Sequence, residues 1–153
     1  MKESAEILTG KADKDLEVAK YNLLAGNLDF IDAICFHSQQ AVEKHLKAFI
    51  AYNNVEFPHG HNGHDIERLL GICKEIDPSF TELDKINPGI LTDYAVDLRY
   101  SEIPIPSMAD AEEAVSIAEE VRPFVLDKIK GISVDKTSDK KPDKNGPELD
   151  IDF

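Results

Sequence analysis

The segment from residue 29 to residue 52 is the part of the sequence that most constrains the fold. It reads DFIDAICFHSQQAVEKHLKAFIAY and contains neither Gly nor Pro over about six helical turns. Its small and apolar residues cover more than one face of a helical wheel, so other parts of the chain must pack against it on several sides. The sequence therefore predicts a long central helix inside a helical domain.

One polar stripe runs along this predicted helix. Gln40, Glu43 and Lys47 stand at positions i, i+3 and i+7, which places their side chains on one face. On a solvated face, Glu43 and Lys47 would form an ordinary helix pair that contributes about 0.2 to 0.5 kcal/mol. On a covered surface, polar groups need hydrogen-bond partners. We take the stripe as the leading candidate site and keep the solvated pair as its alternative.

Amphipathic patterns on either side predict further helices. Residues 4–25 place Ala and Leu side chains at alternating spacings of three and four, and the following Gly26-Asn27 indicates a helix stop. Asn27 or Asp29 is the expected N-cap of the central helix.

Gly, Pro and Asn residues divide the middle of the chain. Residues 53–63 show no period and predict a loop. Asp65 is expected to open a third helix that ends at Asp77-Pro78, and residues 80–86 are expected to form a further turn or two. The residues expected to be buried in a helix that starts near Pro88 are Ile90, Leu91, Tyr94, Ala95 and Leu98.

The last helix and the tail follow. Ser107 and Asp110 have the spacing of a capping box, with Asp in place of Glu, and predict the start of a long helix. Its expected buried residues are Ala111, Ala114, Val115, Ala118, Val121, Val125 and Ile129. Residues 131–153 are rich in Ser, Asp, Lys and Pro, which predicts a flexible tail. The alternative is that Leu149, Ile151 and Phe153 dock as an added strand or into a groove.

These elements indicate an all-α fold. No segment pairs β-branched runs with turn residues, so we expect an antiparallel up-and-down bundle of four main helices plus one or two short helices. The length fits one domain, which we place at residues 1–130.

Composition narrows the function classes. The net charge of −13 repels nucleic acid at long range, so RNA binding would need a local basic groove. No apolar run approaches the ~20 residues of a membrane span, and the acidic N-terminus lacks the features of a secretory signal. We therefore expect a cytoplasmic protein without membrane contact.

Cys35 and Cys73 lack the spacing of zinc or redox motifs and are expected to be buried free thiols.

The histidines give a weaker candidate site. His59, His61 and His64, with Asp65, carry groups that could ligate a divalent metal, but their spacing matches no strong zinc motif. A solvated loop that ends in a capped helix is the favoured alternative, and we expect no metal. The central helix separates its two histidines, at positions 37 and 45, by about 12 Å, so they would serve packing or capping rather than joint chelation.

Arg99 is the remaining candidate. It lies between Tyr94 and Tyr100, where the predicted helix meets a Pro-rich segment. It would neutralise the helix C-terminus or point its guanidinium into a groove, to hold a phosphate or a partner carboxylate. No glycine-flanked serine, phosphate loop or dinucleotide motif occurs, so the sequence supplies no evident nucleophilic catalyst.

Three runs of sequence together resemble a known family. They are FHSQQAVEKHLKAF at residues 36–49, HDIERLL at residues 64–70 and LRY at residues 98–100. Their order and spacing resemble the HEPN domain, named for higher eukaryotes and prokaryotes nucleotide-binding, over residues 5–128.

The resemblance implies a small all-α bundle that commonly dimerises and is encoded in prokaryotes beside a minimal nucleotidyltransferase, in toxin and antitoxin or stress systems. Many such relatives are metal-independent ribonucleases, and some are thought to bind nucleotides. The ribonuclease branch carries an Arg followed four to six residues later by a His. Here no His follows Arg68, Arg99 or Arg122, so the signature is missing.

We therefore expect a homodimeric, non-catalytic partner of a minimal nucleotidyltransferase that binds a nucleotide or phosphate ligand and requires no cofactor. The expected ligand-binding residues are Gln40, Glu43, Lys47, His64 and Arg99. One alternative is a metal-independent ribonuclease toxin that uses Arg99 as the cation, with Tyr94, Tyr100 or His64 beside it. Another is a dimeric assembly module without a ligand, in which the polar stripe is the dimer contact.

Overall fold

The computed structural model describes residues 2–95 and 105–129, which form helices joined by short links. The α-helices are α1 (Lys2–Ala25), α2 (Ile31–Tyr52), α3 (Ile66–Ile76) and α4 (Met108–Lys128). The 3-10 helices are η1 (Leu28–Phe30), η2 (Gly60–His64), η3 (Pro78–Ile86) and η4 (Pro88–Ala95). No strand occurs among the described residues, so the all-α prediction is confirmed.

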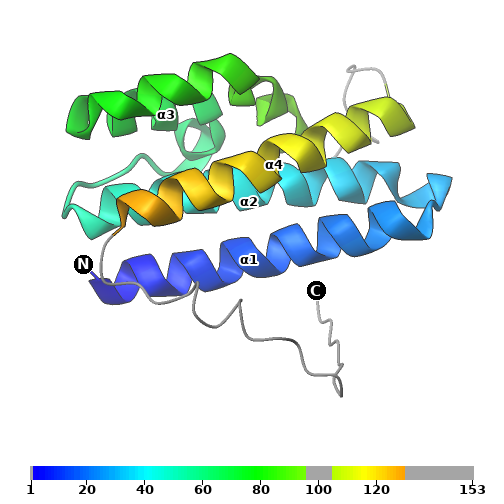
Figure 1. The fold of residues 1–153 in the computed structure, drawn as a ribbon, viewed down its shortest axis with the longest axis horizontal. Helices are drawn as coiled ribbons and strands as arrows, with labels where there is room; N and C mark the ends of the chain where they lie inside the picture. The colour runs from blue at the N-terminus through cyan, green and yellow to red at the C-terminus, as the bar shows by residue number, and fades with distance from the viewer. Residues whose placement is uncertain (1, 96–104, 130–153) are drawn as a thin grey trace.

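Helix α2 is the centre of the molecule, as its apolar sequence predicts. It contacts α1, α3, α4 and η4 (Figure 1). Most of its side chains are buried, and the exceptions include Phe36, Gln40 and Lys47. A helix that is apolar around most of its circumference is stable only when neighbours cover it in this way.

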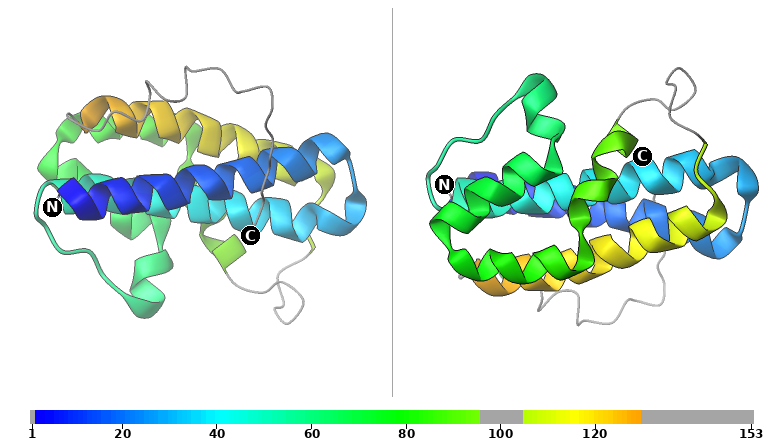
Figure 2. Two further views of the ribbon diagram at one scale, coloured as in Figure 1. Left: turned by 90° about the horizontal axis from the view of Figure 1, so that it is seen from below. Right: turned by 90° about the horizontal axis from the view of Figure 1, so that it is seen from above.

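The helices run in two directions along one axis. Helix α1 leads through a tight link into α2, which returns antiparallel to it (Figure 2). Helix α4 begins at the end where α1 passes into α2 and then runs in the same direction as α2. The up-and-down arrangement therefore describes the α1–α2 hairpin, and the long connection through α3, η3 and η4 returns the chain to the starting end.

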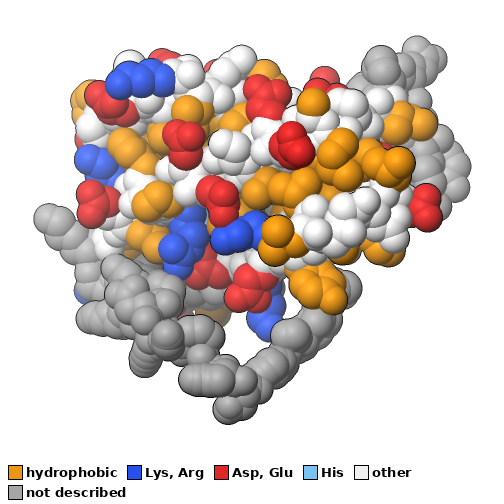
Figure 3. All heavy atoms as spheres, turned by 45° about the vertical axis from the view of Figure 1, so that its right-hand side comes forward, with side chains coloured by type: hydrophobic (Ala, Val, Ile, Leu, Met, Phe, Trp, Pro, Cys, Tyr) orange, Lys and Arg blue, Asp and Glu red, His pale blue; other side chains and the backbone are white. Residues whose placement is uncertain are grey.

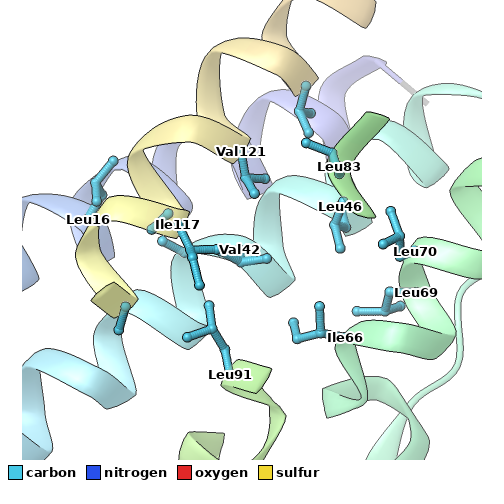
Figure 4. Close-up of a cluster of buried hydrophobic side chains, with 14 of the residues drawn as sticks. Leu16, Val42, Leu46, Ile66, Leu69, Leu70, Leu83, Leu91, Ile117 and Val121 are labelled. Carbon is cyan, nitrogen blue, oxygen red and sulfur yellow. The ribbon is translucent and has the colours of Figure 1, made fainter. Parts of the chain in front are cut away.

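The hydrophobic core lies between α2 and the elements around it. Val42 and Leu46 of α2 point toward side chains from α3, η3, η4 and α4 (Figure 4). Phe80 of η3 is fully buried, and its ring lies 4.4 Å from that of Phe49 and 5.1 Å from that of Phe124. Ring pairs at these separations add to the stabilisation from apolar burial.

Side-chain caps fix several helix starts. Asp65 and Ser107 cap the helices for which they were predicted. Asn27 was expected to cap the central helix but caps η1 instead, and α2 begins after Phe30 without a side-chain cap. Asn27 accepts a hydrogen bond from the backbone N–H of Asp29, and Asp65 accepts one from that of Arg68. Ser107 and Asp110 form a reciprocal capping box at the start of α4. These bonds satisfy backbone donors that a helix start leaves without intrahelical partners.

Several predicted boundaries were wrong. The central α-helix begins at Ile31, because η1 occupies the turn before it. The predicted loop at residues 53–63 ends in η2, and the predicted helix from Pro88 is the 3-10 helix η4. Ile90 was expected to be buried, yet it is 39% exposed, because the tighter winding of a 3-10 helix changes which side chains share a face.

Other sequence predictions fall partly or wholly outside the described residues. Leu98, Arg99, Tyr100 and the tail at residues 131–153 belong to this group. Among the described residues, no helix is both long enough and apolar enough to cross a bilayer.

The two cysteines are buried free thiols, as predicted. Burial raises the pKa of Cys35 to about 12, and the nearby carboxylates of Asp110 and Asp32 add to the rise. Burial also raises the pKa of Cys73. Neither thiol is set up as a nucleophile, which requires the thiolate form.

We expect Leu46→Ala to lower the free energy of unfolding by about 2 to 5 kcal/mol, because it leaves a cavity beside the fully buried centre of α2. Urea denaturation followed by circular dichroism measures this loss. The matched control is Leu24→Ala at a side chain that is 86% exposed, where the change should stay within about 0.5 kcal/mol. Equal losses in the two variants would contradict the central position of α2.

Candidate functional site

Glu43 is the centre of a hydrogen-bonded cluster on α2. Its side chain is buried, with the residue only 3% exposed, yet both carboxylate oxygens have partners. Lys47 Nζ lies 2.7 Å from Oε2, and His64 Nδ1 lies 3.0 Å from Oε1. Gln39 Nε2 and Gln40 Nε2 donate to the same Oε1 at 3.0 and 3.3 Å. A buried carboxylate is stable only with such compensation.

Gln39 joins this cluster to the loop that follows α2. Its side chain is fully buried, and its Nε2 also lies 3.3 Å from the carbonyl oxygen of His64. Its Oε1 accepts a hydrogen bond of 2.7 Å from Gln40 Nε2. Both the ring and the backbone of His64 are therefore held in place by side chains of α2.

Residues 57–64 lie over one side of the cluster. The ring of Phe57 is centred 5.2 Å from Lys47 Nζ, a cation–π distance, and the ring of His59 lies 5.3 Å from that of Phe57. A Cβ atom on Gly63 would lie 2.6 Å from the carbonyl oxygen of Pro58. The close turn of this loop therefore requires a residue without a side chain at position 63.

The charge state of Glu43 fixes the roles of its partners. Burial alone would raise the pKa of Glu43, but hydrogen bonds from Lys47, His64 and Gln39 outweigh it, so the pKa lies below its usual value. The carboxylate is thus ionised at neutral pH and can only accept hydrogen bonds, which makes His64 Nδ1 the donor. The other ring nitrogen, Nε2, remains for solvent or a ligand, and the side chain is 48% exposed.

A second set of polar groups continues from the cluster toward α1. Lys44 Nζ lies 3.2 Å from Gln40 Oε1 and 2.6 Å from Asp15 Oδ2. His37 Nδ1 lies 2.8 Å from the other oxygen of Asp15. Hydrogen bonds therefore connect α1, α2 and the loop before α3 without interruption.

A third set links α1, α2 and α4. Asp13 lies 3.3 Å from Nε2 of the fully buried His45 and 2.7 Å from Nε of Arg122. Burial raises the pKa of Asp13, but hydrogen bonds from His45 and Arg122 outweigh this effect and hold it below its usual value. His45 Nδ1 is buried and has no hydrogen-bond partner in the described structure.

The structure brings together most of the residues proposed for the leading site. Gln40, Glu43, Lys47 and His64 are in direct contact, and the stripe is not an ordinary solvated pair, since the Lys47 side chain is only 13% exposed. Arg99 and Tyr100 lie outside the described residues, so their contribution stays a prediction.

Tyr94 does not join the cluster. It interacts with Cys35. On α2, Cys35 lies eight residues before Glu43, which corresponds to a rise of about 12 Å. Burial raises the pKa of Tyr94 to about 12, and the nearby Cys35, Asp110 and Glu113 add to the rise. Its phenol therefore stays protonated at neutral pH.

The candidate metal ligands are not gathered in the described part of the chain. His59 contacts Phe57, His64 contacts Glu43, and the side chain of His61 is outside the described set. No group of three or more His, Cys, Asp or Glu residues among those described is placed to hold a metal ion.

Sequence analysis missed several members of these networks. Gln39 stands four residues before Glu43, so helical spacing alone could have included it. Asp13, Asp15 and Arg122 come from other helices, and no local pattern connects them to α2. His37 and His45 contact different aspartates of α1.

Comparison with known proteins places the chain in a family. The model of the HEPN domain matches residues 5–129. The chain therefore belongs to the HEPN family. The crystal structure of an archaeal HEPN homologue aligns with a TM-score of 0.60 at 22% identity, over 82% of this chain and 98% of that one. This similarity supports the HEPN fold. No curated protein matches the sequence.

We expect Glu43→Gln to lower the free energy of unfolding by about 1 to 3 kcal/mol at pH 7, because it leaves the covered Lys47 without a counter-charge. The folded-state pKa of Glu43 is depressed, so the difference from wild type should be complete above the ordinary value of 4.5 and should shrink as the pH falls below it. Chemical denaturation between pH 3 and 8 measures both effects.

The control for this variant is Glu82→Gln. Glu82 pairs with Lys85 on an exposed surface, where an ion pair contributes at most about 1 kcal/mol. If both variants lost the same stability with the same pH profile, the Glu43 cluster would have no special role.

Proposed function

We propose that this HEPN-domain protein is a cytoplasmic, non-catalytic binding partner in a prokaryotic toxin and antitoxin or stress system. In this proposal it forms a homodimer, associates with a minimal nucleotidyltransferase, and binds a nucleotide or another phosphate-bearing ligand at the Glu43 cluster. Membership of the HEPN family supports the class of system, and the geometry of the cluster supports the site.

The observation that carries the proposal is the fixed orientation of His64. Glu43 Oε1 and Gln39 Nε2 hold its ring and its backbone, while the outer part of the ring is accessible. A protonated imidazole held in this way can donate Nε2–H to a phosphate oxygen at little further cost in side-chain entropy. Lys44 and Lys47 of α2 belong to the same hydrogen-bonded network, in which they pair with Asp15 and Glu43.

The composition of the site favours binding over catalysis. Cleavage of RNA without a metal needs an acid–base group and a cation for the charge that develops on phosphorus. Lys47 and Lys44 already pair with Glu43 and Asp15. The protonated Tyr94 contacts Cys35, which lies about 12 Å from Glu43 along α2. The Arg and His spacing of the ribonuclease branch is also missing from the sequence.

One observation favours a ribonuclease as the second candidate. A histidine whose Nδ1 donates to a buried carboxylate, with Nε2 accessible, has the arrangement of a general base. In this alternative His64 would take the proton, and Arg99 would supply the cation.

We expect ATP, GTP or AMP to raise the melting temperature of the wild-type protein, because a ligand at 100 times its dissociation constant stabilises the native state by about 2.7 kcal/mol. His64→Ala should abolish most of this shift. The matched control is His59→Ala, an exposed histidine in the same loop, which should leave the shift unchanged. Differential scanning fluorimetry measures all three proteins.

Two results would contradict this proposal. The first is no thermal shift at millimolar nucleotide, which would favour the assembly module without a ligand. The second is cleavage of tRNA that persists in the presence of a metal chelator and is lost in the His64→Ala variant. This result would establish the ribonuclease alternative.

We also expect a complex with a minimal nucleotidyltransferase, if the neighbouring gene encodes one. Co-expression followed by size-exclusion chromatography with light scattering gives the mass of the complex and of the free HEPN protein. A monomer that does not associate with the neighbouring protein would contradict the partner role.

A further inference from the structure

One end of the bundle presents large apolar side chains to solvent. This end is formed by the last turns of α1, by η1, by the first turns of α2 and by the start of α4. The exposed apolar residues there are Tyr21, Leu24, Leu28, Phe30, Phe36 and Ile105, with exposures from 37% to 86%. We call these six residues the apolar end. Figure 3 shows hydrophobic side chains gathered over this part of the surface.

The charged residues around the apolar end are acidic. Residues 21–43 and 105–121 contain no Lys or Arg. The same segments supply Asp29, Asp32, Asp110, Glu112 and Glu113. On the face drawn in Figure 3, acidic side chains border the hydrophobic ones, and Lys or Arg side chains adjoin them on one side. Lys20 is adjacent in sequence, but Glu119 pairs with it at 2.8 Å.

We propose that the apolar end is a docking surface for a positively charged amphipathic helix of another protein. Contiguous apolar side chains on a soluble protein commonly mark an interaction site. A helix with one apolar face can bury such a surface, and Lys or Arg residues beside that face would meet the surrounding carboxylates. This surface is distinct from the Glu43 cluster, so the inference does not depend on the proposed nucleotide ligand.

The charge pattern disfavours the other occupants. A second copy would bring a second set of carboxylates against the first, and like charges at an interface are repulsive. The end of the chain carries Leu149, Ile151 and Phe153, but Glu148, Asp150 and Asp152 alternate with them. An anionic lipid surface would be repelled for the same reason.

The test uses a fluorescein-labelled Leu and Lys peptide of about 18 residues, long enough for five helical turns, and the full-length protein. The double variant Leu24→Gln/Leu28→Gln should weaken the affinity in fluorescence anisotropy by at least about tenfold, since each leucine loses apolar burial. The matched control is Ile7→Gln/Val55→Gln, two exposed apolar residues elsewhere with the same change in chemistry. It should bind like wild type.

A second pair of variants tests the charges. Glu112→Gln/Glu113→Gln should reduce the salt dependence of binding more than Glu3→Gln/Glu6→Gln, although both remove two exposed carboxylates. This comparison separates the local acidic border from the general attraction of a protein with net charge −13 for a basic peptide.

Three outcomes would overturn the proposal. The first is equal loss of affinity in the apolar variant and its control. The second is a wild-type dimer in light scattering that Leu24→Gln/Leu28→Gln converts to a monomer, because a second copy would then occupy the surface. The third is a truncation after Ile129 that binds the peptide at least about tenfold more tightly than the full chain, because the tail would then be the occupant.

Discussion

Burial of α2 on several sides is the constraint on which the rest of the structure depends. Because this helix is apolar around most of its circumference, it is stable only while α1, α3, α4 and η4 cover it. These four elements therefore pack around the same helix, which brings residues distant in sequence into contact. The polar networks, the loop over Lys47 and the bundle end with exposed apolar residues all take their positions from this arrangement.

The same burial explains why the polar groups of α2 are arranged in sets around carboxylates. Three histidines each contact an acidic side chain, at Glu43, Asp15 and Asp13. Each carboxylate also receives a Lys or Arg, so charge is balanced locally where water is partly excluded. What distinguishes the Glu43 cluster is that one member, His64, is held rigidly and yet reaches the surface.

Local signals made much of the fold predictable from the sequence. The absence of Gly and Pro marked α2, and the capping residues Asp65 and Ser107 marked the starts of α3 and α4. Gln40, Glu43 and Lys47 were predictable because helical spacing alone places them on one face. The 3-10 winding of η4 was not, because its apolar spacing also fits an α-helix.

Sequence patterns could not predict the contacts between side chains of different helices. Whether Asp13 meets Arg122 depends on how α1 and α4 pack, and no periodicity in either helix reports this. The contact of His64 with Glu43 depends on a loop whose course is set by Gly63 and by the buried Gln39. Such contacts are properties of the assembled bundle.

The absence of basic residues from residues 21–43 and 105–121 also affects how the protein is oriented while it diffuses toward a charged partner. It leaves Asp29, Asp32, Asp110, Glu112 and Glu113 without a Lys or Arg in the same segments, so this end of the bundle is locally negative. Near a positively charged partner, the protein would rotate during diffusion so that this negative end approaches first. Encounters would then start from a narrow range of orientations, and dissolved salt would broaden that range.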